Sequence, residues 1–391
     1  MSFPTHTCTT THAPELTTPP SAGTLSDVDG ELFIKPCTAQ EISFYESSIA
    51  DHPDFADYMP TFLGTLTLDQ KASDFSILEA GEALLAQHQQ AANHDPAHHD
   101  HHAHLVVSED GTIAEDKTLH VCDHHSHVGT SQEEEQVDAV VAKVAKPELA
   151  LPNVVGKRIS TNQAIVLENT AHGFVKPNIL DAKLGVRLYA DDASAEKKIR
   201  FDKVSLETTH AEFGFRIAGM RVYQGEGATG KNIDSEGYRI YDKNYGRLSV
   251  NKDNIVEAFR NFLFSENAGV DEELGKLVSQ AFLVDVEKIQ KVLESQESSM
   301  YSASLLFVYE GDGKALRAAM EEASKPKPEK VAVTAEDEDS EDDEDTTPKI
   351  YAVKVIDFAH AEWTPAGTGP DENSLKGVRS VAKILKGIAG I

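Results

Sequence analysis

Two low-complexity tracts divide this 391-residue chain and limit what it can fold into. Eleven of its 17 histidines fall within residues 88–127, and nine of the ten residues at 336–345 are acidic. Tracts of this kind lack the apolar side chains that a packed core requires. We therefore expect a low-complexity insert of His and acidic residues at about 86–148, a disordered acidic loop at about 322–348 and a disordered tail at 1–20. Any folded unit must be built from the segments between them.

The rest of the chain is apolar enough to bury a core, since hydrophobic residues make up 40% of the sequence. Its 36 basic and 65 acidic residues give a net charge of −29, which argues against a general binder of nucleic acid or of anionic membranes. A small anionic substrate stays open, because it needs only a local basic pocket. Three scattered cysteines without CxxC spacing favour a reducing compartment. With no signal peptide and no apolar window near the ~20 residues of a membrane span, we expect a soluble intracellular protein without a transmembrane segment.

One glycine-rich motif suggests a phosphate loop but lacks the required context. Residues 225–231 (GEGATGK) fit GxGxxG and nearly fit the Walker pattern, except that Asn232 stands where a Ser or Thr would bind Mg²⁺. Both motifs require a helix directly afterwards, and the following NIDSEGYRIYDK has no helical periodicity. We therefore expect a surface loop here. The histidine tract likewise predicts adventitious metal affinity rather than a zinc site, because structural zinc needs ligands at fixed spacing in a folded frame.

Residues 177–184 (PNILDAKL) carry the most informative charge pattern. As a strand, this segment would place Asp181 and Lys183 on one face and three apolar residues on the other. A charged pair on a half-buried strand is costly unless it is solvated or used. The pair is therefore either an ordinary surface ion pair or part of a functional site.

Two further strands lead into chemically useful residues. An apolar strand at 351–356 ends at Asp357, whose carboxylate could hold Mg²⁺. Another strand carries Lys35 and precedes a helix. Glu41 lies three residues after Thr38, so it could complete a capping box, or it could form an ion pair that directs Lys35 towards nucleotide phosphates, and the two alternatives are compatible. Phosphoryl transfer from ATP needs such a lysine, a metal-binding carboxylate and a second carboxylate at the acceptor hydroxyl.

Three motifs occur in order along the chain: Pro177-x-x-x-Asp181-x-Lys183-x-Gly185, Ser304-Leu-Leu306 and Ile356-Asp357-Phe358. They are similar to the PxxxDxKxG, SLL and IDF motifs of the inositol polyphosphate kinases. The stretches DDASAEKKIRFDKVSLETT and FGFRIAGMRVY resemble the multikinase branch of that family, especially its fungal members. The resemblance covers about 24–66 and 151–391.

The resemblance implies an α+β fold with two protein-kinase-like lobes, at 21–168 and 169–391, and with ATP bound between the lobes. It also implies catalytic roles: Asp181 would meet the inositol hydroxyl as base or orienter, and Lys183 would bind the acceptor or the transferring phosphate. The implied ATP-binding residues are Lys35, Glu41, Glu168, Thr170 and Asp357, with Glu168 and Thr170 reaching adenine through backbone atoms. Asp357 and Ser304 would hold Mg²⁺.

A basic helix at about 194–208 supplies candidates for binding an anionic substrate. Lys197, Arg200 and Lys203 recur every three positions and fan over roughly a third of the helix circumference. A solvated face accounts for most charge runs of this kind, but an inositol polyphosphate needs several cations at once. The resemblance adds His360 as a further substrate contact.

The leading hypothesis is an ATP- and Mg²⁺-dependent inositol polyphosphate multikinase. It would phosphorylate inositol trisphosphate and tetrakisphosphate, leading to inositol pentakisphosphate. The alternatives are an inositol hexakisphosphate kinase, within the same family, and a nuclear interaction scaffold, from a different class. Family analogy also predicts location in the nucleus and cytoplasm, and phosphoinositide lipid and transcription-factor partners. We expect no direct binding of nucleic acid.

Overall fold

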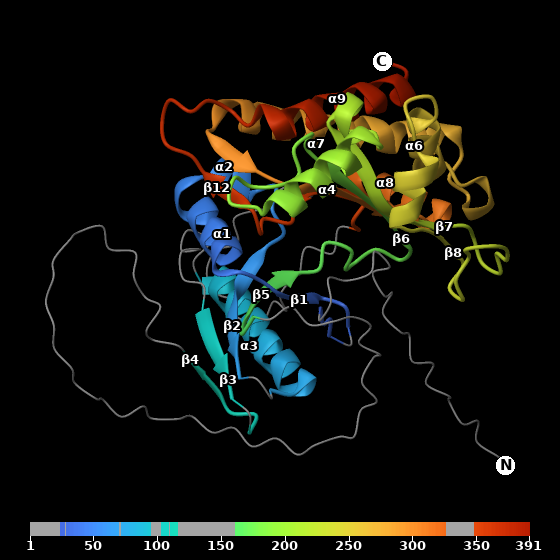
Figure 1. Ribbon diagram of the computed structural model, residues 1–391. Coiled ribbons are helices and arrows are strands. Elements are labelled where there is room, and N and C mark those ends of the chain that lie inside the picture. Colours follow the sequence, from blue (N-terminus) through green and yellow to red (C-terminus); the bar gives the residue numbers. More distant parts are fainter. Residues whose placement is uncertain are drawn as a thin grey trace, which may run out of the picture. The chain divides into compact units, whose positions relative to one another are not determined.

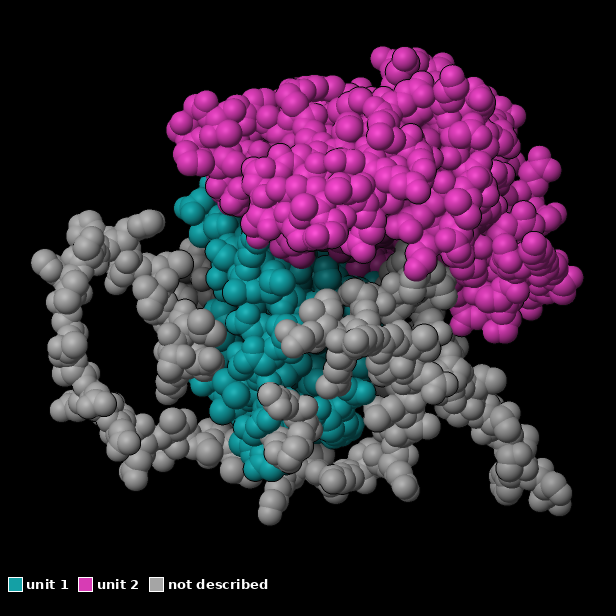
Figure 2. Space-filling model, in the orientation of Figure 1, with its two compact units in different colours: residues 1–51, 60–169 teal, residues 52–59, 170–391 magenta. Residues whose placement is uncertain are grey.

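The computed structural model describes residues 24–27, 29–69, 72–94, 103–108, 110–115, 161–325 and 348–391. The chain divides into two compact units, which Figure 2 shows in different colours. Unit 1 comprises residues 1–51 and 60–169, and unit 2 comprises residues 52–59 and 170–391. The predicted tail at 1–20 lies outside the described residues, as do most of the predicted insert and acidic loop.

Unit 1 is a five-stranded sheet with a long helix packed on it (Figure 1). Its strand order is β1–β5–β2–β3–β4, with the bounds Leu32–Pro36, Gln163–Glu168, Phe62–Leu68, Ala103–Val107 and Ile113–Glu115. All neighbouring strands run antiparallel except β2 and β3. A parallel pair needs a long crossover connection, which helix α3 (Asp74–His94) provides. Apolar side chains of α3 and the sheet, such as Leu84, Ile34 and Leu66, form the core. Helix α1 (Ala39–Asp51) follows β1, as the sequence predicted.

Part of the predicted low-complexity insert is folded. Helix α3 continues to His94, and strands β3 and β4 also lie within the predicted range 86–148. Strand β3 has the alternating burial of a half-buried strand: Leu105 and Val107 lie in the core of unit 1, and their neighbours are less buried. The histidine-rich composition around the strand concealed this alternation. The expectation that this range contributes nothing to a packed core is therefore wrong in these segments. Residues 95–102, 109 and 116–148 lie outside the described part.

Unit 2 is built around a second sheet, in which all neighbouring strands are antiparallel. Its strand order is β11–β10–β6–β7–β8, with the bounds Tyr351–Ile356, Ser304–Glu310, Pro177–Leu184, Phe215–Tyr223 and Tyr238–Tyr241. The predicted strand at 351–356 is confirmed. The three sequence motifs lie on β6, on β10 and at the end of β11, so segments far apart in the sequence become neighbours in one sheet.

Helices cover this sheet, and α7 and α9 pack against each other while α9 also contacts β6 and β7 (Figure 1). The C-terminal helix α9 buries five apolar residues: Leu375, Val378, Val381, Leu385 and Ile388. The helices of this unit are α4 (Ala195–Leu206), α5 (His210–Phe213), α6 (Ile255–Leu263), α7 (Glu272–Ser295), α8 (Gly313–Ser324) and α9 (Glu372–Ala389). A π-helical turn at Tyr245–Ser249, a 3₁₀ turn at Glu266–Ala268 and a small sheet of β9 (Ser298–Met300) and β12 (Ala361–Trp363) complete it.

A short segment from the N-terminal part of the chain also belongs to unit 2. Helix α2 (Pro53–Ala56) buries Phe55 completely, and the ring packs edge-on against Phe358 and Trp363 at centroid distances of 6.0 and 5.3 Å. The predicted lobe boundary after residue 168 lies one residue before the observed division. From the sequence, residues 52–59 were placed in the N-terminal lobe, because Phe358 and Trp363, which contact Phe55, are about 300 positions away along the chain.

The glycine-rich segment 225–231 is a loop between β7 and β8, and it is followed by a strand rather than a helix. Most of its residues are exposed, which confirms the predicted surface loop. Among the described helices, none is long and apolar enough to cross a lipid bilayer.

Candidate active site

Strand β6 presents Asp181 and Lys183 from the centre of the unit 2 sheet. On one side, Asp181 lies opposite Leu306 of β10, and Lys183 lies opposite Ser304. On the other side, the ladder to β7 shifts register between Asp181 and Ala182, and such a β-bulge changes the local twist of a strand. The apolar residues that alternate with Asp181 and Lys183 are buried, as the sequence pattern predicted: Leu180, Ala182 and Leu184.

Asp181 is a partly buried carboxylate with one unsatisfied oxygen. Its Oδ1 atom is buried and has no hydrogen-bond partner among the described residues. Burial raises the pKa of Asp181, and Lys183 acts in the opposite direction. A buried acceptor without a donor costs about 1–3 kcal/mol, and such a group in a folded protein calls for a functional explanation. Asp181 is therefore a candidate functional residue of this sheet.

Lys183 is held by two residues that follow other strands. Its Nζ atom donates to the carbonyl of Ser302 at 2.8 Å and to Oδ2 of Asp357 at 3.1 Å. The ion pair of Lys183 is therefore with Asp357, whereas the sequence left open a pair with Asp181. Ser302 and Asp357 both have positive φ angles, 62° and 69°. Non-glycine residues adopt this conformation at a cost of order 1–3 kcal/mol, and such strain is concentrated at active sites.

Asp357 and Ser304 offer oxygen donors that suit a divalent cation. The Asp357 side chain is 39% exposed and so remains accessible. Ser304 is fully buried, and its hydroxyl has no partner among the described residues. The described part of the chain contains no cluster of three or more His, Cys, Asp or Glu side chains suited to a metal. Mg²⁺ is usually held by one or two carboxylates together with phosphate oxygens, so these residues fit a nucleotide-bound cation.

Helix α4 brings one of its predicted cations to His360. The Ser194 hydroxyl caps the helix by accepting a hydrogen bond from the Lys197 amide. Lys197 Nζ lies 3.5 Å from His360 Nε2. Burial and the nearby Lys197 lower the pKa of His360, which keeps its ring neutral at pH 7.

The other two predicted cations of α4 are more exposed. The guanidinium of Arg200 lies over the ring of Phe201, 5.1 Å from its centroid. Lys203 lies 3.7 Å from Glu207, one helical turn away. Exposed pairs of this kind hold their partners weakly, so both side chains can turn towards an anionic ligand.

In unit 1, Lys35 and Glu41 form an ion pair of 2.9 Å, with side chains that are 13% and 2% exposed. The amide of Glu41 also donates to the Thr38 hydroxyl at 3.2 Å, which caps helix α1. The ion pair proposed for Glu41 is therefore formed, together with the half of the capping box in which the Thr38 hydroxyl accepts. Cys37 lies between these residues, and burial raises the pKa of its thiol to about 12, so it stays protonated.

Glu168 and Thr170 lie at the division between the two units in chain order. Glu168 ends β5, where its amide donates to the Thr61 carbonyl at 3.0 Å and its carboxylate accepts from the Thr61 hydroxyl at 2.8 Å. The amide of Glu168 is thus engaged within unit 1. Thr170 begins the long segment of unit 2.

The family model for inositol polyphosphate kinases matches residues 164–386, more than half of the chain. The matched range contains Asp181, Lys183, Ser304, Asp357 and His360. The chain belongs to the inositol polyphosphate kinase family. This confirms the resemblance stated from the sequence motifs and the prediction that the chain is a kinase of inositol polyphosphates.

Individual relatives match this kinase to different extents. The inositol polyphosphate multikinase of Saccharomyces cerevisiae is 29% identical, over 93% of this chain and 94% of the relative. The human inositol hexakisphosphate kinases 1 and 3 are 30% and 32% identical, each over 57% of this chain. The chain spans only 52% and 51% of the length of those two relatives.

A solved structure supports the fold. The inositol phosphate multikinase of S. cerevisiae, in complex with ADP and Mn²⁺, matches with a TM-score of 0.53 and 25% identity, over 92% of this chain and 99% of that one. The predicted α+β, kinase-like fold is thereby confirmed.

Two buried residues near the site of this kinase, an arginine and a neutral histidine, were not predicted from the sequence. Arg216 of β7 lies opposite Lys183 and is 5% exposed, and burial lowers its pKa to about 10. His210 is fully buried and donates from Nδ1 to the Gly185 carbonyl at 2.7 Å, while burial, with Arg216 nearby, lowers its pKa to about 3. A charge within the otherwise apolar stretch FGFRIAGM was the signal that could have revealed Arg216. The contact of Lys183 with the Ser302 carbonyl could not be predicted in this way, because every residue type has a backbone carbonyl.

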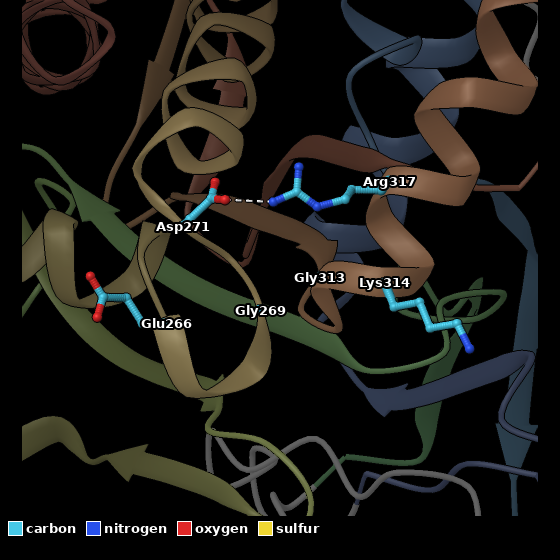
Figure 3. Close-up of a pocket in the computed structure, with 6 residues that line it drawn as sticks. All are labelled: Glu266, Gly269, Asp271, Gly313, Lys314 and Arg317. Carbon is cyan, nitrogen blue, oxygen red and sulfur yellow. Dashed lines mark hydrogen bonds and ion pairs between the residues drawn. The ribbon is translucent and has the colours of Figure 1, made fainter.

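Unit 2 also contains a pocket of about 640 Å³ that shares no residue with the candidate active site (Figure 3). It is lined by Glu266, Gly269, Asp271, Gly313, Lys314 and Arg317. Asp271 and Arg317 form an ion pair of 2.5 Å within it. A Cβ at Gly313 would lie 2.1 Å from the Gly269 carbonyl oxygen, so the chain segments before α7 and α8 meet here at a distance that only glycine permits.

Proposed function

We propose that this inositol polyphosphate kinase is a multikinase, which transfers the γ-phosphate of ATP to hydroxyls of inositol trisphosphate and tetrakisphosphate and so leads to inositol pentakisphosphate. The observation that carries the kinase chemistry is the partly buried Asp181 carboxylate, with its unsatisfied Oδ1, beside the Lys183–Asp357 ion pair. Similarity to a yeast multikinase along nearly its whole length favours this substrate range. The matches to the hexakisphosphate kinases cover between 57% and 67% of the chain.

The proposed roles in phosphoryl transfer follow from the chemistry of each group. Asp181 accepts the hydrogen bond, or the proton, of the attacking inositol hydroxyl. Lys183 neutralises charge on the transferring phosphate, and its Ser302 and Asp357 contacts keep the ammonium in position. Asp357, with Ser304, would hold Mg²⁺ on the nucleotide, where the cation would offset phosphate charge.

The remaining ATP contacts are proposed for unit 1 and the adjoining residue. Lys35 would bind nucleotide phosphates while Glu41 orients it, an arrangement supported by their 2.9 Å ion pair. Glu168 and Thr170 would meet adenine through backbone atoms. On the acceptor side, three cations of α4 would bind the phosphates of the inositol polyphosphate: Lys197, Arg200 and Lys203. The neutral ring of His360 would add a hydrogen bond.

Two alternatives remain in competition with this proposal. An inositol hexakisphosphate kinase would share all three motifs, and a nuclear interaction scaffold would not need Asp181 or Asp357. We also propose, from family analogy alone, location in the nucleus and cytoplasm, with phosphoinositide lipids and transcription factors as further partners.

The deciding experiment is a product profile. The purified chain is incubated with Mg·ATP and, separately, with defined inositol tris-, tetrakis- and hexakisphosphates, and the products are separated by anion exchange. We expect inositol pentakisphosphate from the first two substrates and little product from the third. Efficient phosphorylation of hexakisphosphate alone would establish the first alternative, and no product from any substrate would favour the scaffold.

A further inference from the structure

The loop after β6 holds an arginine to which the proposed function gives no role. The guanidinium of Arg187 lies between two aromatic rings, 5.0 Å from the centroid of Tyr189 and 4.9 Å from that of Tyr301. Its Nε atom donates to the Tyr189 carbonyl at 3.0 Å. Stacking fixes the plane of a guanidinium and leaves its edge for hydrogen bonds. Because the side chain is 37% exposed, a ligand can reach that edge.

Arg187 contacts the same turn that organises the acceptor side of the site. Tyr301 directly precedes Ser302, whose carbonyl binds Lys183. The amide of Tyr301 donates to the carbonyl of His360 at 3.1 Å. Within unit 2, Arg187 therefore contacts the turn that also binds Lys183 and His360, two residues that we propose to contact the inositol polyphosphate.

The edge of the Arg187 guanidinium is occupied by a carboxylate from its own loop. Arg187 Nη2 donates to Asp191, whose side chain is 88% exposed. Arg187 lowers the pKa of Asp191, so the carboxylate is charged at neutral pH. An exposed ion pair of this kind is weak and is screened by salt. A phosphate group carries more charge and matches the planar fork of arginine, so it can compete for the same edge.

The loop can release this carboxylate without unfolding. Lys198 Nζ donates to the backbone carbonyl of Asp191 at 2.8 Å, and the Tyr189 hydroxyl donates to Asp202 of α4 at 2.9 Å. These contacts hold the backbone when the Asp191 side chain turns into solvent. The guanidinium also keeps its stacking partners, so the cation is already oriented when a ligand arrives.

We propose that Arg187 binds a phosphate group of the inositol polyphosphate and that Asp191 occupies this subsite until the substrate displaces it. The inference rests on the proposed function, because it names a subsite of the same acceptor site. Asp191 then acts as an internal competitor, which weakens the binding of every acceptor that must displace it to place a phosphate at Arg187.

The test is a double-mutant cycle with Arg187→Met, Asp191→Asn and the combined variant. Steady-state kinetics give kcat and the KM values for inositol trisphosphate and ATP, and calorimetry gives the Kd of inositol trisphosphate without ATP. Arg187→Met should raise KM and Kd for inositol trisphosphate about tenfold, because a charge-assisted contact is lost. Asp191→Asn should lower both roughly threefold, and it should have no effect once Arg187 is absent. The KM for ATP should not change in any variant.

A matched control is Arg317→Met, which removes another exposed arginine of unit 2 paired with an aspartate, Asp271, in the pocket that shares no residue with the candidate active site. It should leave the KM for inositol trisphosphate unchanged, and melting temperatures should show that every variant is folded. If Arg187→Met does not fold, Arg187→Lys replaces it in the cycle, since lysine keeps the charge and loses the fork. The proposal is overturned if Asp191→Asn leaves KM and Kd unchanged, or lowers them equally with and without Arg187. Lack of kinase activity in the unmodified chain would instead overturn the proposed function, and calorimetry would still test the subsite.

Discussion

The left-handed backbone at Asp357, with φ of 69°, limits which side chains can replace it. Asn and Asp tolerate this region because their short polar side chains bond locally, whereas Ala has no such compensation. The same residue supplies the carboxylate that pairs with Lys183. Conformation and charge at this position can therefore be tested separately.

Replacing Asp357 by Asn should remove the charge and keep the backbone, while replacing it by Ala should disturb both. We expect kinase activity to fall by at least about two orders of magnitude in both variants, because metal-bridged phosphates carry much of the transition-state stabilisation. Only the Ala variant should also lose about 1 kcal/mol of unfolding free energy. Activity assays and thermal unfolding of both variants check this, and full activity of Asp357→Asn would remove the residue from the site.

For Asp181 we expect the opposite effect on stability, because burial makes its negative charge destabilise the folded state. Asp181→Asn should abolish turnover and leave Mg·ATP binding intact, but its unfolding free energy should equal or exceed that of the parent chain. Burial raises the pKa of Asp181 in the folded state, so its destabilising effect develops as pH rises above the unfolded value, about 4, and disappears in acid. The stability gained by the Asn variant should thus be larger at pH 7 than at pH 4 in parallel denaturation curves. A gain independent of pH would contradict this account of Asp181.

At the scale of elements, the start of helix α9 fixes the loop that follows β6. The Asn373 side chain accepts hydrogen bonds from the amides of Val186 and Arg187, both at 2.9 Å. One turn further on, Gly377 faces Gly214, and a Cβ on Gly377 would lie 2.4 Å from the Gly214 carbonyl oxygen. Close backbone contact at this point sets where the loop lies relative to the sheet of unit 2.

Two glycines of α9 form a matched pair of test positions. Gly377→Ala should cost roughly 2–3 kcal/mol of unfolding free energy, because neither backbone can give way, and it should raise the KM for inositol polyphosphates. Gly387→Ala, on the same helix with open space around it, should be neutral or stabilise by up to about 1 kcal/mol. Denaturant unfolding measures both, and equal effects would show that helix propensity alone is at work.

Local periodicity explains which elements could be predicted from the sequence. The strand at 351–356 carries its own apolar pattern and was predicted correctly. Asp181, Lys183 and Asp357 were singled out by charge within apolar strands. The partner of Lys183, the position of Phe55 in unit 2 and the folded part of the histidine tract depend on contacts between distant segments, which no local pattern encodes.

For the whole molecule, charge opposes the substrate that we propose. The chain carries a net charge of −29, and residues 337–345, outside the described part, hold eight acidic side chains. A polyanionic acceptor is repelled by such a balance at distances up to the Debye length, about 10 Å at 0.1 M salt. Binding must therefore depend on local cations of unit 2.

Deleting residues 337–345 should leave kcat nearly unchanged and lower the KM for inositol polyphosphates, with the larger effect at low salt. A variant with the same length of Ser and Gly in place of this segment should behave like the deletion if charge is the cause. Kinetics of both variants at two ionic strengths decide the question. A large loss of kcat in a well-folded deletion variant would instead make the segment part of the catalytic site.

The position of helix α2 has a consequence for the order in which the protein can mature. Residues 52–59 leave the ribosome early, but the rings that bury Phe55 belong to Phe358 and Trp363, near the end of the chain. Unit 1 has all its residues once position 169 has been made. Domains usually complete folding in the order of their synthesis. Here residues 52–59, which belong to the later unit, cannot be buried until Phe358 and Trp363 have been synthesised.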